Sequence, residues 1–256
     1  MSTCRCVMAW LCVAVLSACS SGGAVGARSS NSDAAIANMN LGAGYLQQGN
    51  TTLAIERLQR ALAQDPRLVR AHSTIALAYD QIGSLEEAET HYLRATQLDP
   101  DDGNAANFYA VFLCSRQKRW ADAEPYFRRA AEDPNYPTPE AALTNAGVCA
   151  RDAGEIEVAI ENFRGALARN ANFPDALLNM IELSYEQRNF MQTRAFVQRY
   201  LAARPPTAPV LWTCFNVETE LGDAEAAQRC ASLLRSDFRG SPELAQLEEQ
   251  QRRDGR

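Results

Sequence analysis

The stretch GSLEEAETHYLRATQLDP, residues 83–100, decides the fold of this chain. Within it, Ala88, Tyr92 and Ala95 are spaced so that they lie on one face of a helix. The same order of small, large and small residues recurs 34 or 35 residues away on either side. The recurring residues are Ala54, Leu58 and Ala61 upstream, and Ala123, Phe127 and Ala130 downstream. Each of these stretches ends with Asp-Pro, so the chain is built from a repeated unit.

This unit resembles the tetratricopeptide pattern, a helix-turn-helix of 34 residues. Tyr45 and Tyr79 hold the same place in the first two units, and Gly49 and Gly83 occupy the turns between helices. A single unit would expose too much apolar surface, so the units must stack. We therefore expect an all-α fold, a right-handed superhelical solenoid of about six units.

The solenoid is predicted to span residues 34–241, because the repeat continues beyond its three clearest units. A fourth unit lacks the closing Asp-Pro but keeps five positions in register, namely Gly147, Gly154, Ala159, Phe163 and Ala166. Two degenerate units follow over residues 174–205 and 208–238. The polar segment 242–256 is predicted to be a capping tail that ends as a frayed helix.

An apolar run of ten residues, VMAWLCVAVL at 7–16, follows Arg5 near the start of the chain. It is too short to span a membrane and is typical of a signal peptide, which we assign to residues 1–18. The sequence LSAC at 16–19 resembles the bacterial lipobox, in which the cysteine carries the lipid and begins the mature chain. Cys19 is therefore the predicted lipidation site. An ordinary cleaved signal with an incidental cysteine is the alternative.

The charge of the chain bears on how it would reach a membrane. The net charge is −6, and loss of Arg5 with the signal changes it to −7. An acidic chain is not an obvious binder of nucleic acid or anionic lipid, so attachment must come from the lipid itself. By resemblance to the sorting rule of such lipoproteins, Ser20 directs the chain to the outer membrane. Residues 19–33 are rich in Ser, Gly and Ala and are predicted to be a lipidated N-terminus and flexible linker.

Four cysteines lie within the solenoid, and an exported chain meets an oxidising compartment. Cys114 and Cys149 fall late in the first helices of two consecutive units, which stack as neighbours. We expect these two residues to form a disulfide. Cys214 and Cys230 fall on the two antiparallel helices of the sixth unit. There, a second disulfide and a pair of buried thiols are both open alternatives.

Residue types that support catalysis are sparse in this chain. The two histidines, His72 and His91, both lie in the second unit and are interpreted as packing or surface residues. Neither has metal-ligand spacing with the cysteines, and no glycine-rich phosphate loop or nucleophile elbow is present. We expect a protein-binding scaffold with no metal, no cofactor, no small-molecule substrate and no enzymatic activity.

Three strings within the repeats carry a more specific resemblance: LGAGYLQQGN at 41–50, NFYAVFLC at 107–114 and NAGVCARDAG at 145–154. With the paired cysteines and the lipobox, they resemble the type IV pilus biogenesis and stability lipoproteins of the PilW/PilF family. The resemblance implies a lipoprotein at the periplasmic face of the outer membrane. It would act as a pilotin that assists localisation or multimerisation of pilus secretin subunits and so supports twitching motility. A tetratricopeptide lipoprotein of an outer-membrane protein assembly machine or a cell-wall synthesis complex is the alternative.

Candidate partner-binding residues follow from the repeat register, which points particular first-helix positions toward the concave face. In the first three units these positions are Met39, Ala43, Leu46, Arg70, Ser73, Leu77, Asp80, Asn107 and Val111. For each of them the alternative is that the side chain only faces water. A concave face of this kind is suited to a peptide or a partner helix.

Overall fold

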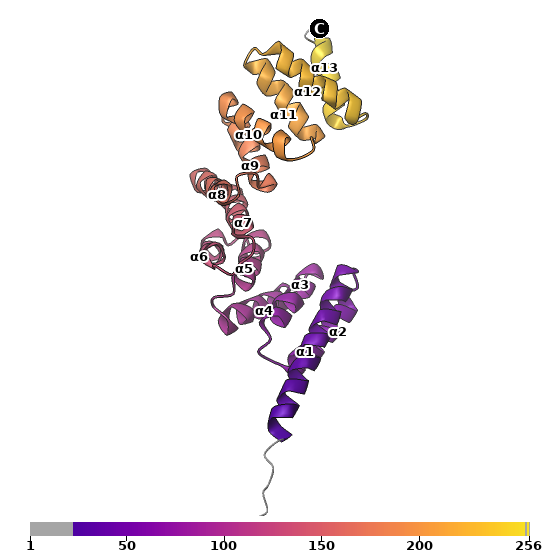
Figure 1. Cartoon of the computed structure of the whole chain (residues 1–256), viewed down its shortest axis with the longest axis vertical. Helices are drawn as coiled ribbons and strands as arrows, with labels where there is room; N and C mark the ends of the chain where they lie inside the picture. The colour runs from indigo at the N-terminus through magenta and orange to yellow at the C-terminus, as the bar shows by residue number, and fades with distance from the viewer. Residues whose placement is uncertain (1–22, 254, 256) are drawn as a thin grey trace, which may run out of the picture.

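The computed structural model describes residues 23–253 and 255, which form thirteen α-helices and no strand. The helices are α1 (Gly23–Gln47), α2 (Thr51–Gln64), α3 (Val69–Gln81), α4 (Leu85–Leu98), α5 (Gly103–Ser115), α6 (Trp120–Glu132), α7 (Pro139–Asp152), α8 (Ile156–Arg169), α9 (Pro174–Glu186), α10 (Phe190–Ala203), α11 (Ala208–Glu220), α12 (Ala224–Asp237) and α13 (Pro242–Arg253). The first twelve pair as six helix-turn-helix units that stack along the long axis (Figure 1). The predicted all-α solenoid of six units is therefore confirmed. None of the described helices combines the length and apolar character that a bilayer crossing requires.

The core repeats one packing motif. In the first four units the second helix buries an alanine, a large residue and another alanine, all between 0 and 2% exposed. These are Ala54, Leu58, Ala61, Ala88, Tyr92, Ala95, Ala123, Phe127, Ala130, Ala159, Phe163 and Ala166. Burial of one such large side chain stabilises the fold by about 1.5–3 kcal/mol. Each of them packs between the two helices of its own unit and the first helix of the next.

Glycine makes the closest of these approaches. A Cβ atom on Gly147 would lie 2.5 Å from Cε1 of Phe163, and one on Gly42 would lie 2.6 Å from Cγ of Leu58. No side chain fits in such a space without movement of its neighbours. Glycine at these two positions therefore allows the first helix to lie directly against the large residue of the second.

The turns inside the units need a left-handed backbone conformation. Glycine supplies it in four units, where Gly49, Gly83, Gly154 and Gly222 have φ angles of 75, 80, 86 and 77°. Units three and five use Lys118 and Arg188 instead, at φ 55 and 56°. Residues with a Cβ atom are disfavoured there, so these two turns carry a conformational cost that the glycine turns avoid.

The joints between units are closed by side-chain hydrogen bonds. The carboxylates of Asp65, Asp99 and Asp133 each accept from the backbone N–H two residues later, at 2.9, 3.1 and 2.8 Å. Asn170 accepts in the same way from Asn172 N–H at 3.2 Å, although unit four lacks the Asp-Pro pair. The first four joints therefore share an Asx side chain, and the fourth forms without the proline.

The last two units depart from the repeat yet retain a buried core. In unit five a polar pair replaces the usual contact, where the Thr193 hydroxyl donates to the Ser184 hydroxyl at 2.9 Å. The Ser184 hydroxyl in turn donates to the Met180 carbonyl at 2.6 Å, so both buried groups are satisfied. Helix α13 then covers the end of the stack with Leu247, which is fully buried. The segment expected to be a capping tail that ends as a frayed helix forms a helix over Pro242–Arg253, with Leu247 as its buried residue.

The N-terminal boundary differs from the expectation. A flexible linker was expected up to residue 33, whereas α1 begins at Gly23. Asn38 donates to Gln64, the last residue of α2, at 3.0 Å, and Ala35 is the first fully buried residue of α1, so the turns of α1 before Ala35 extend beyond the end of α2 (Figure 1). Extending an existing helix costs far less than nucleating one, which accounts for helix in a Ser- and Gly-containing segment. The predicted signal peptide at 1–18 and Cys19 lie outside the described residues.

Two disulfides join helices of the solenoid. Cys114 of α5 is bonded to Cys149 of α7, with Cα atoms 5.8 Å apart. Cys214 of α11 is bonded to Cys230 of α12, with Cα atoms 6.1 Å apart. The first bond links two consecutive units and the second closes the sixth unit on itself. Of the two alternatives for Cys214 and Cys230, the structure has the disulfide.

The close approach at Gly147 predicts opposite effects for two helical glycines. Gly147→Ala forces its Cβ into Phe163 and is expected to lower the free energy of unfolding by about 1–3 kcal/mol. Gly165→Ala meets only Leu143 at 3.5 Å and is expected to raise it by about 0.5–1 kcal/mol, because alanine favours the helix. Urea unfolding followed by circular dichroism measures both. Equal effects of the two substitutions would contradict the packing described.

The disulfides predict a graded loss of stability on reduction. The Cys114–Cys149 bond closes a separation of 35 residues, and its removal is expected to cost about 4 kcal/mol on the chain-entropy view. The Cys214–Cys230 bond closes 16 residues, and its removal is expected to cost about 3 kcal/mol. Unfolding of the paired Cys→Ser variants measures each cost. Non-reducing peptide mapping that found unmodified thiols at Cys114 and Cys149 would overturn the assignment.

Candidate functional site

The first helices of the units, α1, α3, α5, α7, α9 and α11, succeed one another along the stack, and cavities open between some of them. One cavity of about 440 Å³ lies between α3 and α5. It is lined by Arg70, Ser73, Thr74, Asp102, Asn104 and Phe108. Arg70 and Ser73 were predicted from the register. Phe108 was missed, although its ring is 44% exposed and is the main apolar surface that this cavity offers.

Other predicted groove residues are half-buried and already engaged. The Asp80 carboxylate accepts from Arg116 Nε at 2.7 Å. The Asn107 side-chain oxygen Oδ1 accepts from Asn145 Nδ2 at 3.2 Å, which links α5 to α7. Leu77 and Val111 pack against the hydrophobic clusters of their units. Ala43 is half-buried on α1. These positions therefore contribute more to the contact between units than to an open surface.

The structure corrects the expectation for two residues of unit one. Met39 is 2% exposed and Leu46 is 9% exposed, and both belong to the core cluster that contains Leu58 and Ile75. They were expected to face the groove because their register matches that of inward-pointing positions. Helices α2 and α3 both pack against α1, so these two side chains have little surface to offer to a partner.

A second cavity, of about 500 Å³, lies between α9 and α11 near the C-terminal end of the stack. Its lining consists of Leu178, Ile181, Glu182, Tyr185, Glu186, Pro209, Val210 and Thr213. The predicted groove stopped at unit three and missed this site. The repeat register could have predicted this site. Leu178 lies ten residues before Arg188, which has a left-handed backbone in the turn of its unit, and Ser73 lies ten residues before Gly83, the equivalent turn residue of unit two.

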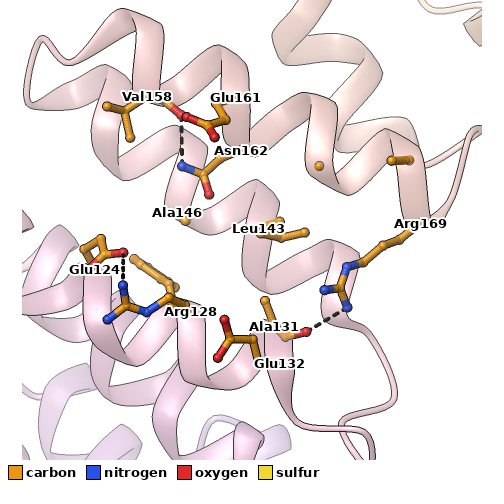
Figure 2. A pocket seen from close by; sticks show the side chains of 13 residues that line it. Glu124, Arg128, Ala131, Glu132, Leu143, Ala146, Val158, Glu161, Asn162 and Arg169 are labelled. Carbon is orange, nitrogen blue, oxygen red and sulfur yellow. Dashed lines mark hydrogen bonds and ion pairs between the residues drawn. The ribbon is translucent and has the colours of Figure 1, made fainter.

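A third cavity, of about 570 Å³, lies between the second helices α6 and α8, with Leu143 and Ala146 of α7 between them (Figure 2). Its rim mixes charges of both signs. Glu124 pairs with Arg128 at 3.6 Å, and Arg169 Nη1 donates to the Ala131 carbonyl at 2.7 Å. The remaining lining residues are Phe127, Glu132, Val158, Glu161, Asn162, Gly165 and Ala168. The mixed rim gives this cavity no clear preference for the charge of a ligand.

The two histidines form a pair between α3 and α4, in which His72 is buried and His91 is half-buried. Their Nδ1 atoms are 2.9 Å apart, and His72 Nε2 lies 3.1 Å from the Pro66 carbonyl oxygen. Since a carbonyl only accepts, His72 Nε2 is assigned as a donor and its Nδ1 as the acceptor from His91. Burial lowers the pKa of both rings, and for His91 the nearby His72 lowers it further. The pair therefore packs as neutral imidazoles.

No group of three or more His, Cys, Asp or Glu side chains in the described ranges is arranged to hold a metal ion. The chemistry that these surfaces present consists of apolar patches, hydrogen-bonding groups and surface ion pairs. Such features recognise a protein segment by shape and charge. The cavities between the first helices are therefore the candidate functional site.

Comparison with known proteins identifies the class. The family described as Tetratricopeptide repeat matches residues 24–69, 40–103, 73–137 and 144–208, which together make up more than half of the chain. The chain therefore belongs to the tetratricopeptide repeat family.

Several relatives within this class are pilus proteins. The chain is 27% identical over 212 residues to the type IV pilus assembly protein PilF of Pseudomonas aeruginosa, covering 83% of this chain and 84% of PilF. A crystal structure of PilW, described as a widely conserved type IV pilus biogenesis factor, aligns with a TM-score of 0.70 and 26% identity over 83% of this chain and 97% of that one. A structure of Pseudomonas aeruginosa PilF aligns with a TM-score of 0.73 and 27% identity over 86% of this chain and 99% of that one. The resemblance to the PilW/PilF family is confirmed.

The histidine pair predicts a dependence of stability on pH. Because the folded pKa values lie below 6.5, both rings are neutral in the folded and unfolded chain above that pH. As the pH falls below 6.5, the unfolded chain binds protons first, and stability is lost by up to about 1.4 kcal/mol per pH unit for each histidine. Unfolding of the His72→Asn, His91→Gln variant between pH 7 and 5 is expected to show a flatter profile than the natural chain. Parallel profiles would contradict this assignment.

Proposed function

We propose that this protein is a lipid-anchored scaffold of type IV pilus biogenesis, which acts as a pilotin for the pilus secretin. In this role it binds secretin subunits at the periplasmic face of the outer membrane and promotes their localisation or multimerisation. It works by binding and performs no covalent chemistry.

The observation that carries the proposal is the extent of the similarity to PilF and PilW. The chain spans 97% of the solved PilW chain and 99% of the solved PilF chain at 26 and 27% identity. Other solved tetratricopeptide proteins, at 15–18% identity, align over similar shares of this chain with TM-scores of only 0.53–0.59, so the likeness to PilW and PilF exceeds what the shared repeat fold alone gives. A shared solenoid presents a shared sequence of first-helix surfaces, which is where these proteins can bind partners.

The geometry of the site is consistent with a binding role. The cavities between α3 and α5 and between α9 and α11 are lined by a mixture of apolar, hydrogen-bonding and charged side chains. In the described part of the chain, the two histidines bond to each other and His72 bonds to a backbone carbonyl. These features suit recognition of a protein segment and offer no arrangement of nucleophile and base.

The N-terminal helix gives the proposed lipid anchor a mechanical role. The turns of α1 before residue 35 project beyond α2, and twelve helical residues span about 18 Å. A lipid on Cys19 would therefore be joined to the first unit largely through helix, which holds the solenoid away from the membrane surface. Confinement to one membrane face raises the effective concentration toward secretin subunits that arrive there.

Deletion of the gene tests the proposal. The deletion strain is expected to lose heat-resistant secretin multimers from the outer membrane and to lose twitching motility, and the natural chain should restore both. A Cys19→Ser chain, expressed at matched level, is expected to restore them poorly because it lacks the anchor. Immunoblots of fractionated membranes and a twitching assay measure these outcomes.

Two results would contradict the proposal. A deletion strain with normal secretin multimers and normal twitching would remove the pilus role. Co-purification of the solubilised chain with outer-membrane protein assembly or cell-wall synthesis proteins, in place of the secretin, would assign it to those machines.

A further inference from the structure

The cavity between α9 and α11, here called the α9–α11 pocket, combines apolar surface with acidic groups. Leu178, Ile181 and Val210 supply the apolar lining. Leu178 is 36% exposed, whereas Ile181 and Val210 are 4 and 2% exposed, so Leu178 supplies most of the accessible surface among these three. An apolar side chain from another protein could bury this surface.

The charged side chains of the two helices that form this pocket, α9 and α11, are all acidic. Helices α9 and α11 together carry five carboxylates, at Asp175, Glu182, Glu186, Glu218 and Glu220, and neither helix contains a lysine or arginine. The two carboxylates that line the pocket are those of Glu182 and Glu186.

Neighbouring helices neutralise some of these carboxylates but leave Glu186. The Arg151 guanidinium of α7 donates to Glu182 at 2.8 Å, and Arg188 lies 3.8 Å from Glu220. The buried Glu218 is held by Arg194 of α10. Among the described residues no ion-pair partner is found for Glu186, which is exposed at the rim of the pocket. The rim therefore has an acceptor available for a cation.

The other cavities do not share this character. The cavity between α3 and α5 is lined by one basic side chain, Arg70, and one acidic side chain, Asp102. The cavity between α6 and α8 mixes arginines with glutamates (Figure 2). Of these three cavities, the α9–α11 pocket is the one whose charged lining is only acidic.

We propose that the α9–α11 pocket docks a basic and apolar protein segment, with an aliphatic side chain against Leu178 and an adjacent lysine or arginine on Glu186. The inference rests on the proposed function, since the segment would belong to the secretin partner. Charge complementarity gives specificity for a basic segment, and the apolar contact adds to the affinity. The pocket lies at the end of the stack remote from α1, so a docked segment would be held away from the membrane anchor (Figure 1).

Fluorescence anisotropy with defined peptides tests this pocket directly on the full chain purified in detergent. The probe is a twelve-residue labelled peptide that has two leucines between two lysines in a Gly-Ser background. The comparison peptide has glutamate in place of each lysine. The lysine peptide is expected to bind roughly tenfold more tightly, and its affinity should fall as salt is raised. Equal affinity for the two peptides would overturn the proposal.

Matched variants locate the binding. Leu178→Ser and Glu186→Lys should each weaken binding of the lysine peptide roughly fivefold or more, and Glu186→Lys should shift the preference toward the glutamate peptide. Met191→Ser and Glu248→Lys remove an exposed apolar residue and an exposed acid elsewhere, and should leave affinity unchanged. Thermal unfolding confirms that all four variants are folded. Binding that is insensitive to both pocket substitutions would overturn the proposal.

Complementation separates this inference from the proposed function. If the deletion strain loses secretin multimers and the double Leu178→Ser, Glu186→Lys chain restores them fully, the pocket is not the secretin site and the proposed function stands. If the deletion strain keeps its multimers, the proposed function falls whatever the peptides show. Poor restoration by the double variant, with normal restoration by Met191→Ser, is the result expected when both hold.

Discussion

The structure depends on one contact that recurs in each of the first four units, in which a large side chain is packed between small residues. Phe163 lies against Gly147 so closely that a single methyl group at position 147 would overlap its ring. Such an approach sets the distance between the two helices of a unit and leaves the large residue's remaining surface for the next unit. Since no unit can bury its own apolar face, stability accumulates along the stack, and every unit depends on its neighbours.

This dependence explains how the ends and the irregular units are held. The sixth unit has a disulfide within itself, and α13 covers its outer face with Leu247. In unit five, where threonine and serine replace the usual apolar pair, their hydroxyls bond to each other and to the backbone. The Cys114–Cys149 bond joins units three and four, at the middle of the stack. The irregular units five and six thus carry additional polar or covalent constraints, and a further covalent link joins two of the regular units.

Stacking also determines which surfaces remain for partners. A helix in the middle of the solenoid contacts its own unit and both neighbours, so most inward positions are used in packing or in ion pairs such as that of Asp80 and Arg116. Cavities are present where short or exposed side chains line the contact between two neighbouring units. The seams of α3 with α5 and of α9 with α11 differ in charge, so one scaffold can present chemically distinct sites along its length.

The sequence by itself determined the repeat, the number of units and the pair of cysteines most suited to bonding, because each follows from spacing along the chain. It did not determine that helix begins at Gly23, since local composition favours a linker and only the continuation of α1 makes it helical. Nor could the sequence show that Met39 and Leu46 are buried whereas Arg70 lines a cavity, because all three have inward-pointing register. Whether such a residue is covered or open depends on the side chains of the adjoining unit, about 34 residues away, and only the tertiary structure brings those side chains together.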